Sequence, residues 1–372
     1  MTDRWYYIHA GQTNGPVTAA QLQQMVTAGT ISADTVVWSD DGDAAVPQAK
    51  RSPAAEVIQD TGEISVEEEQ DWFADVDVSP KQASPPPVAL HALTAVPVAT
   101  AVQAPAAASA AGRIFLGAAT SIGKVRERNE DFFLTQQFAW SEGTLNRESA
   151  VVVVADGMGG YAAGDQAARL TAQTVLKELT PLQLARLDGT GAEVSAGALA
   201  GAVEKSLQAA NRVVLEQSQA RAEWRGMGAT AAAVLVWNGW AIVSHVGDCR
   251  VYHLRAGKLT QVTRDQTVVG RLLELGRITA AEAASNSIRN EVTQCIGKRT
   301  TIEPSRYGRQ LLPGDLLIVA CDGLIAHVND AQLLKAVTHP FDSPRDLAHR
   351  LVNLADHGGG TDNCTVAVVQ CQ

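Results

Sequence analysis

The sequence predicts an α+β fold over residues 113–372, in which a largely antiparallel β-sheet is layered against helices. Four strand candidates follow one another closely, at residues 230–237, 240–246, 250–255 and 259–262. Asn238-Gly239 separates the first pair and Ala256-Gly257 the last pair, and such two-residue separations are typical of β-hairpins. Consecutive hairpins favour antiparallel pairing over a β-α-β series.

The remaining elements fit the same layered domain. Before the hairpins, the pattern predicts strands at 114–118, 131–136 and 150–155 and helices at 162–179 and 197–221. After them, it predicts a strand at 316–320, helices near 330–338 and 343–356, and a last strand at 363–369. The chain has 372 residues, which is more than one hydrophobic core usually holds, so we expect a large domain and a second, smaller unit.

The first 112 residues differ from the rest in composition. Residues 1–49 predict a small α+β domain, with a strand at 5–8, a turn at 11–15, a helix-like stretch at 18–28 that Gly29 ends, and a strand at 35–38. Residues 50–112 are first acidic and then rich in alanine and proline. Such a segment buries too little apolar surface to offset the entropy of ordering, so we expect a disordered linker between domains at 1–49 and 113–372.

Charge and cysteine usage exclude several classes of protein. Residues 1–112 carry 14 acidic and 4 basic side chains, which account for the whole net charge of −10. No basic patch for nucleic acid is indicated, and we expect no membrane span, because the uncharged segment 88–112 is interrupted by prolines. The five cysteines form no Cys-x-x-Cys pair and indicate buried free thiols. We therefore expect a cytoplasmic protein.

Carboxylates lie at the ends of apolar strands in three places. The strand at 150–155 leads into Asp156-Gly157, the strand at 316–320 leads through Cys321 into Asp322-Gly323, and Asp362 precedes the last strand. Acids that converge at one sheet edge repel unless cations lie between them, and Mg²⁺ and Mn²⁺ prefer oxygen ligands. One Asp-Gly pair is more often a plain turn, but two apolar strands that end in the same way favour a metal site.

An arginine and two acids precede the second predicted strand. Arg126 has a planar guanidinium that suits a phosphate group, and Glu130 and Asp131 follow it closely. Taken alone, the charged segment 124–131 is more typical of a solvated loop. A solvated loop and a phosphate-binding segment therefore both stay open as interpretations.

Six short motifs follow one another in residues 117–369. They are Val125-Arg126-Glu127-Arg128-Asn129-Glu130-Asp131, Ala155-Asp156-Gly157-Met158-Gly159-Gly160, Gly226-Met227-Gly228-Ala229-Thr230, Val246-Gly247-Asp248-Cys249-Arg250, Cys321-Asp322-Gly323 and Gly360-Thr361-Asp362-Asn363. In this order they resemble the metal-dependent serine/threonine protein phosphatases of the phosphatase 2C type. The resemblance implies a central antiparallel β-sandwich flanked by helices.

The resemblance also implies a metal centre of two Mg²⁺ or Mn²⁺ ions. By matching position, Asp156 bridges both ions and the Gly157 carbonyl binds one of them. Asp322 and Asp362 resemble ligands of the second ion. Asp248 matches an acid that helps to hold a third ion, but the position of its usual partner is Ala326 here. Two ions are therefore expected, and a third is left open.

The implied reaction is hydrolysis of phosphoserine and phosphothreonine on proteins. Glu130 and Asp131 match acids that hold metal-bound waters, and Arg126 matches the phosphate-binding arginine. The resemblance implies direct attack by a metal-bridging hydroxide, and the chain has no Cys-x5-Arg motif that would indicate a covalent route. The alternative is a pseudophosphatase, in which the same fold acts as a sensor or scaffold without turnover.

The flanking segments depart from the family pattern. Residues 266–276 resemble the flap beside the active site, with Gln266 in place of the family's histidine. His245 and His327 are expected to be packing or surface residues and not ligands.

The N-terminal unit resembles a bacterial GYF domain through Trp5-Tyr6-Tyr7, Gly15-Pro16-Val17 and Asp34-Thr35-Val36-Val37-Trp38. GYF domains bind proline-rich peptides in an aromatic groove. Met25, Thr30 and Ile31 replace groove aromatics, which favours protein contacts of unspecified type.

Overall fold

The computed structural model describes most of the chain after residue 112 and short parts of the N-terminal unit. The described residues are 5–9, 12–18, 21, 24–25, 28, 37–39 and 113–372, apart from 143, 160–162, 186–193, 280–281 and 284–285. The expected linker at 50–112 lies outside the described residues, as does most of the helix expected at 18–28.

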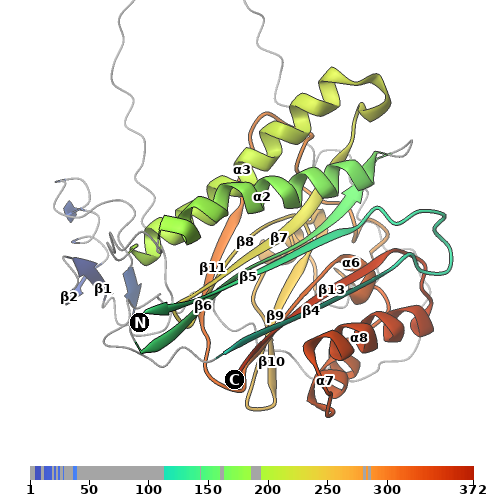
Figure 1. Ribbon diagram of the computed structural model, residues 1–372. Coiled ribbons are helices and arrows are strands. Elements are labelled where there is room, and N and C mark those ends of the chain that lie inside the picture. The colour runs from blue at the N-terminus through green and yellow to red at the C-terminus, as the bar shows by residue number, and fades with distance from the viewer. Residues whose placement is uncertain are drawn as a thin grey trace, which may run out of the picture.

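Two five-stranded antiparallel sheets form the centre of the large domain (Figure 1). The first has the order β11-β8-β7-β6-β5, with β5 (Phe132–Glu142), β6 (Leu145–Met158), β7 (Gly228–Trp237), β8 (Trp240–Val246) and β11 (Ser305–Gln310). The second has the order β10-β9-β12-β13-β4, with β4 (Ile114–Ser121), β9 (Arg250–Arg255), β10 (Lys258–Gln261), β12 (Leu316–Ala320) and β13 (Cys364–Cys371).

Helices cover the outer faces of both sheets, so the predicted sandwich flanked by helices is confirmed. The long helices α2 (Gly164–Ala185) and α3 (Ala196–Ala220) lie on the first sheet, and α7 (Asp330–Thr338) and α8 (Pro344–Gly358) lie on the second (Figure 1). Two short helices, α4 (Val268–Glu274) and α6 (Asp322–Ile325), are inserted between strands. In the described part of the chain, no helix is both long and apolar enough to cross a bilayer.

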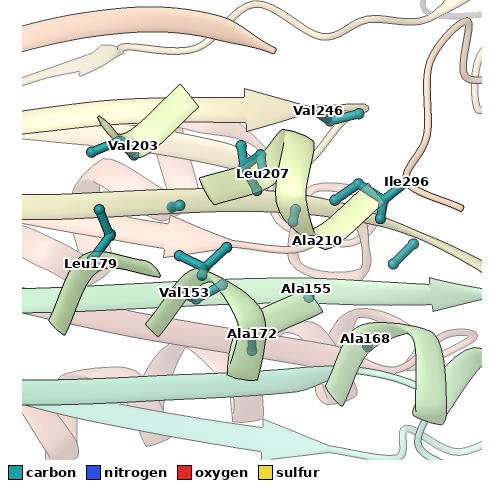
Figure 2. Close-up of a cluster of buried hydrophobic side chains, with 14 of the residues drawn as sticks. Val153, Ala155, Ala168, Ala172, Leu179, Val203, Leu207, Ala210, Val246 and Ile296 are labelled. Atoms are coloured by element: carbon teal, nitrogen blue, oxygen red, sulfur yellow. The ribbon is translucent and has the colours of Figure 1, made fainter. Parts of the chain in front are cut away.

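Strand β6 shows how the sequence builds two cores at once. Successive side chains of a strand point to opposite faces. Val151, Val153 and Ala155 pack under α2 and α3. Figure 2 shows Val153 and Ala155 in this position. Val152 and Val154 instead face the second sheet. Both faces are therefore apolar, which explains why this strand has no polar alternation in the sequence.

Strands β12 and β13 repeat this arrangement in the second sheet. Leu317 and Val369 face the first sheet, while Ile318 and Val368 pack against α7 and α8. Because the central strands of each sheet are buried on both faces, their positions are fixed from two sides. Residues at the strand ends are consequently held in a defined place.

The expected hairpins are present. Asn238 and Gly239 have φ of 47° and 75°, and Ala256 and Gly257 have φ of 49° and 77°. Two consecutive positive φ values are those of a type I′ turn, whose twist matches antiparallel strands. These turns join β7 to β8 and β9 to β10.

The structure also corrects the sequence-based expectations. Strand β11 was missed, because Arg306, Gly308 and Arg309 break its apolar pattern, and it is recognised only by its pairing with β8. In the N-terminal unit, the turn expected at 11–15 is wrong for residues 12–15, because they belong to β2 (Gln12–Val17). Asn14 pairs with Tyr7 of β1 (Trp5–His9), and β3 (Val37–Ser39) pairs on the other side of β1.

The contact between β4 and α8 yields a prediction for stability. A β-carbon at Gly117 would lie 2.1 Å from the backbone nitrogen of Arg345. Gly117→Ala should therefore lower the free energy of unfolding by about 1–3 kcal/mol, measured by denaturant unfolding of the full chain. Gly201→Ala in α3 is the matched control, because a β-carbon there meets no described atom within 4 Å. It should raise the same quantity by up to about 1 kcal/mol. Equal effects of the two substitutions would contradict close packing at Gly117.

Candidate active site

A cleft of about 620 Å³ opens at one end of the sandwich. Residues on both sheets and on the loops between them line it: Arg126, Glu130, Asp156, Gly157, Met158, Gly159, Thr230, Asp248, Asn290, Glu291, Val292, Asp322, Asp362 and Asn363. Every site residue predicted from the sequence lines this cleft except Asp131, which still lies next to Asp156, with one ligand atom of each within 4.8 Å of the other. Asp131 is 8% exposed and does not line the cleft, but its charge acts on Asp156, a lining residue.

The chain directions explain why these residues meet. In antiparallel sheets, the end of one strand lies beside the beginning of its neighbour. Asp156 lies near the end of β6, where it pairs with Thr230, and Asp131 lies directly before β5. Asp322 follows β12 and Asp362 precedes β13 in the second sheet. All four acids therefore belong to the same end of the sandwich.

Close backbone contacts fix two of these ends. A β-carbon at Gly157 would lie 2.1 Å from the carbonyl oxygen of Gly164 and 2.5 Å from that of Glu130. At Gly323 it would lie 1.8 Å from the carbonyl oxygen of Asn363. Only glycine leaves room for these approaches, which press the end of β6 at Asp156 and the beginning of α6 at Asp322 against their neighbours.

Burial and mutual repulsion raise the pKa values of the clustered acids. Burial raises the pKa of Asp131 to about 7, and the charges of Asp322 and Asp362 act in the same direction. Burial raises that of Asp248 to about 7 as well, with smaller contributions from Asp322 and Asp265. The pKa of Asp156 is raised by burial and then by the charges of Asp131 and Asp322. Without a cation, the cluster therefore holds protons near neutral pH.

Two carboxylate oxygens in this cluster have no hydrogen-bond partner among the described residues: Oδ1 of Asp131 and Oδ1 of Asp322. A buried, unpaired carboxylate oxygen is costly unless a cation or a proton satisfies it. The donor set consists of carboxylate and backbone carbonyl oxygens, which hard divalent ions prefer. The residues present therefore fit a divalent metal centre.

Arg126 is held at the edge of this cluster. One of its terminal nitrogens lies 2.6 Å from Oδ2 of Asp362, and the two side chains are 50% and 33% exposed. This ion pair anchors the guanidinium beside the acids while leaving half of it accessible to a ligand. Arg126 is therefore paired with a cluster acid, and its role toward phosphate stays a prediction.

Glu130 links the loop before β5 to the rest of the site through its backbone. Its carbonyl accepts a hydrogen bond of 3.2 Å from the Gly157 N–H, and its own N–H donates to Oδ1 of Asn363 over 2.8 Å. Its side chain lies against Gly164, at the beginning of α2, and burial raises its pKa. Glu130 therefore faces the cleft from a fixed backbone.

Asn363 lines the cleft, and the sequence analysis gave it no role. Its side-chain amide donates to the carbonyls of Ile122 and Arg128, each over 2.9 Å, while its Oδ1 accepts from Glu130. The single side chain thus fastens the whole loop that carries Arg126 to the beginning of β13. Its place next to Asp362 in the last motif was the available signal.

Asp248 lies in the same cleft, in the loop between β8 and β9. Gln266 supports this loop: its Oε1 accepts from the Gly247 N–H over 2.9 Å, and its Nε2 donates to Ser305 Oγ over 3.0 Å. The backbone carbonyl of Gln266 accepts from Thr293, whose neighbours Glu291 and Val292 line the cleft. None of residues 266–276 lines the cleft, but Gln266 connects the Asp248 loop to residues 290–292, which do line it. The resemblance of 266–276 to a flap stays a prediction.

The two histidines do not join the acid cluster. His245 is buried, packs against Tyr307 at a ring distance of 5.6 Å, and has a pKa lowered by burial to about 4. His327 accepts a hydrogen bond of 3.0 Å from the Thr361 N–H and so supports the loop before Asp362. Neither lines the cleft.

The acid cluster predicts how metal binding depends on pH. The folded-state pKa values of Asp131 and Asp248 lie near 7, above the ordinary value of 3.8. Protonation of these two acids therefore stabilises the metal-free protein, and this stabilisation is lost as pH rises from about 4 to about 7. Mn²⁺ requires the ionised carboxylates. The increase in melting temperature on adding Mn²⁺ to metal-free protein should therefore be larger at pH 7 than at pH 5, as scanning calorimetry can measure.

His245 opposes the acids over part of this pH range, but it affects the metal-free and metal-bound proteins alike, so it cancels in the difference between them. Asp131→Asn should reduce the dependence of that difference on pH. An increase in melting temperature that is the same at both pH values would contradict the assignment of these acids to a metal centre.

Two family models match this chain. The model of protein phosphatase 2C matches residues 116–364, and that of GYF domain 2 matches residues 5–47. Among curated proteins, protein phosphatase PhpP of Streptococcus pneumoniae is 31% identical over 256 residues, which are 67% of this chain and 94% of PhpP. The serine/threonine protein phosphatase PstP of Mycobacterium tuberculosis is 34% identical over 246 residues, 66% of this chain but 43% of PstP.

Solved structures agree with these matches. The Streptococcus agalactiae serine/threonine phosphatase is 30% identical and has a TM-score of 0.59, covering 70% of this chain and 100% of that one. The catalytic domain of PstP in complex with two manganese ions is 32% identical and has a TM-score of 0.54, covering 69% of this chain and 97% of that one. The chain belongs to the protein phosphatase 2C family and is a protein-serine/threonine phosphatase.

Proposed function

We propose that the large domain hydrolyses phosphoserine and phosphothreonine on proteins with two hard divalent ions, Mg²⁺ or Mn²⁺, held at the end of the sandwich. The observation that carries this proposal is the convergence of Asp156, Asp322 and Asp362 on one cleft that also holds Arg126, with Asp131 next to Asp156. Oxygen donors, unpaired buried oxygens and an accessible guanidinium together suit a phosphate ester and the cations that activate water toward it.

Asp156 is the acid best placed to be shared by two ions. One of its ligand atoms lies within 4.8 Å of one from Asp131, and the charges of Asp131, Asp322 and Asp248 all act on it. Asp156 and the Gly157 carbonyl would hold one ion, and Asp156, Asp322 and Asp362 would hold the other. Bound there, the ions would supply positive charge that lowers the pKa of an attacking water.

The other residues of the cleft act on waters and on the phosphate. Glu130 and Asp131 orient water through carboxylates that the backbone holds in place. Arg126 binds phosphate oxygens with its accessible half while Asp362 keeps it in position. Asp248 lies close enough to contribute to a third ion, but position 326 is an alanine with no ligand atom, so two ions are proposed.

The pseudophosphatase alternative predicts that the fold is kept while turnover is absent. The complete set of acids speaks against it, because a scaffold has no need to bring four repelling carboxylates together around unpaired oxygens. Hydrolysis of p-nitrophenyl phosphate that requires Mn²⁺ and stops on adding a chelator would exclude the alternative.

For the N-terminal unit we propose a recruiting role. The match to GYF domain 2 over residues 5–47 supports protein contacts, and phosphoproteins are the substrates that the unit would bring to the site. The proposed division is a GYF-like domain at 1–49, a linker at 50–112 and the catalytic domain at 113–372. The cytoplasmic location stays a prediction.

Replacement of the shared acid tests the metal centre directly. Asp156→Asn and Asp322→Asn should each lower kcat for p-nitrophenyl phosphate by about 10³-fold or more, because a neutral amide weakens the ions that activate the attacking water. Calorimetric titration with Mn²⁺ should show weaker binding in both variants. Asp265→Asn is the control outside the cleft: Asp265 pairs with Arg250 over 2.6 Å, and its loss should leave Mn²⁺ binding unchanged. Folded Asp156 and Asp322 variants with near wild-type rates would refute the proposed centre.

Arg126 offers a separate test of phosphate binding. Arg126→Ala should raise KM for a phosphothreonine peptide about tenfold and lower kcat, because the guanidinium hydrogen bonds to phosphate oxygens are lost. Arg128→Ala is the matched control in the same loop, because Arg128 does not line the cleft. Unchanged KM and kcat in Arg126→Ala would show that the ion pair with Asp362 has only a structural role.

A further inference from the structure

One thiol lies within the acid cluster and has no part in the proposed reaction. Cys321 is fully buried between the end of β12 and Asp322. Its Sγ donates to Oδ2 of Asp131 over 3.2 Å, and the Asn363 carbonyl lies 3.7 Å away as a second acceptor. From the sequence it was expected to be one of five buried free thiols with no metal-ligand spacing.

The sulfur forms a compact group with two of the acids. Cys321, Asp131 and Asp156 each offer one ligand atom, and these three atoms all lie within 4.8 Å of one another. Ligand atoms of a single tetrahedral zinc ion lie roughly 3.3–3.8 Å apart, as bond lengths of about 2.0–2.3 Å require. Small side-chain rotations would therefore place all three around one ion, with water as a fourth ligand.

Two further observations favour a metal ion among these three ligand atoms. The Oδ1 atom of Asp131 is buried and has no hydrogen-bond partner among the described residues, so a ligand atom is already available. The Thr365 N–H donates to Cys321 Sγ over 3.0 Å. A backbone donor of this kind stabilises the negative sulfur that a metal–thiolate bond requires.

We propose that this centre can bind metal in a second way, the soft-metal mode, in which Cys321, Asp131 and Asp156 together bind one thiol-binding divalent cation such as Zn²⁺, Cd²⁺ or Co²⁺. On binding, the S–H bond breaks, the metal–sulfur bond forms from the sulfur electron pair, and the proton leaves to solvent. No oxidant or reductant is involved. Mg²⁺ and Mn²⁺ prefer oxygen ligands and leave the thiol protonated.

The two modes exclude each other, because both use Asp131 and Asp156. A soft cation would thus occupy the acids that the phosphatase needs and would inhibit it by displacement. This inference concerns which ions bind, so it can be tested without turnover and stands apart from the proposed function.

The test is a titration of the metal-free full chain with Co²⁺, followed by the near-ultraviolet charge-transfer absorption that thiolate-to-cobalt bonds produce. The wild type should develop this band, and excess Mn²⁺ should remove it. Cys321→Ser keeps a donor toward Asp131 but should lack the band. Calorimetry should show Cd²⁺ binding to Cys321→Ser about tenfold or more weaker than to the wild type, while Mn²⁺ affinity changes less than about twofold.

Cys364→Ser is the matched control, because the Cys364 thiol is buried beside Cys321 but lies outside the group of three ligand atoms. This variant should keep the band. Persistence of the band in Cys321→Ser, or its loss in Cys364→Ser, would overturn the assignment. If Cys321→Ser fails to fold, the competition in the wild type decides: a cobalt band that saturating Mn²⁺ leaves unchanged would show that the thiolate site does not share the acids.

Discussion

Asp131, Asp156, Asp248 and Asp322 repel one another in a largely buried region, and their positions there depend on the register of two antiparallel sheets. Their raised pKa values measure the cost of that arrangement. Isolated strands would let the acids separate and become hydrated. The apolar faces of β6, β12 and β13 prevent this, because each of these strands is held between two cores. Hydrophobic packing at a distance from the cleft thus holds the charges together, and cations offset the repulsion that results.

The exact positions of the loops around the cleft depend on polar and backbone contacts and not on the hydrophobic cores. The Asn363 amide fastens the Arg126 loop, Gly157 and Gly323 allow backbones to touch, and Gln266 joins the Asp248 loop to the flap-like segment. The Asn363 contacts connect segments more than two hundred residues apart in the chain, and the other contacts connect shorter stretches. The loops that carry Arg126 and Asp248 are therefore each supported by a side chain from another loop, as a preorganised site requires.

The sequence predicted those elements well whose formation depends on local residues alone. The turns at Asn238-Gly239 and Ala256-Gly257 specify their hairpins locally, and β8, β9, β12 and α7 have the predicted bounds. Strand β11 escaped prediction, because its charged residues form a strand only through pairing with β8. For the site, ordered motifs identified the acids and Arg126. The roles of Asn363 and Cys321 depend on contacts between distant segments, which no spacing in the sequence encodes.

The place of β13 in its sheet has a consequence for biosynthesis. This strand lies between β12 and β4, and it pairs Cys371 with Ile114 across the whole length of the domain. The ribosome makes β4 first among the sandwich strands and β13 last. Until β13 emerges, β4 has no neighbour in its sheet, one edge of β12 stays unpaired, and the nascent chain lacks Asp362 and Asn363. Such exposed edges are sites where chains associate wrongly, so chaperone protection during translation matters most for this interval. The same delay keeps the catalytic centre incomplete until the sheet closes, which ties the onset of activity to completion of the fold.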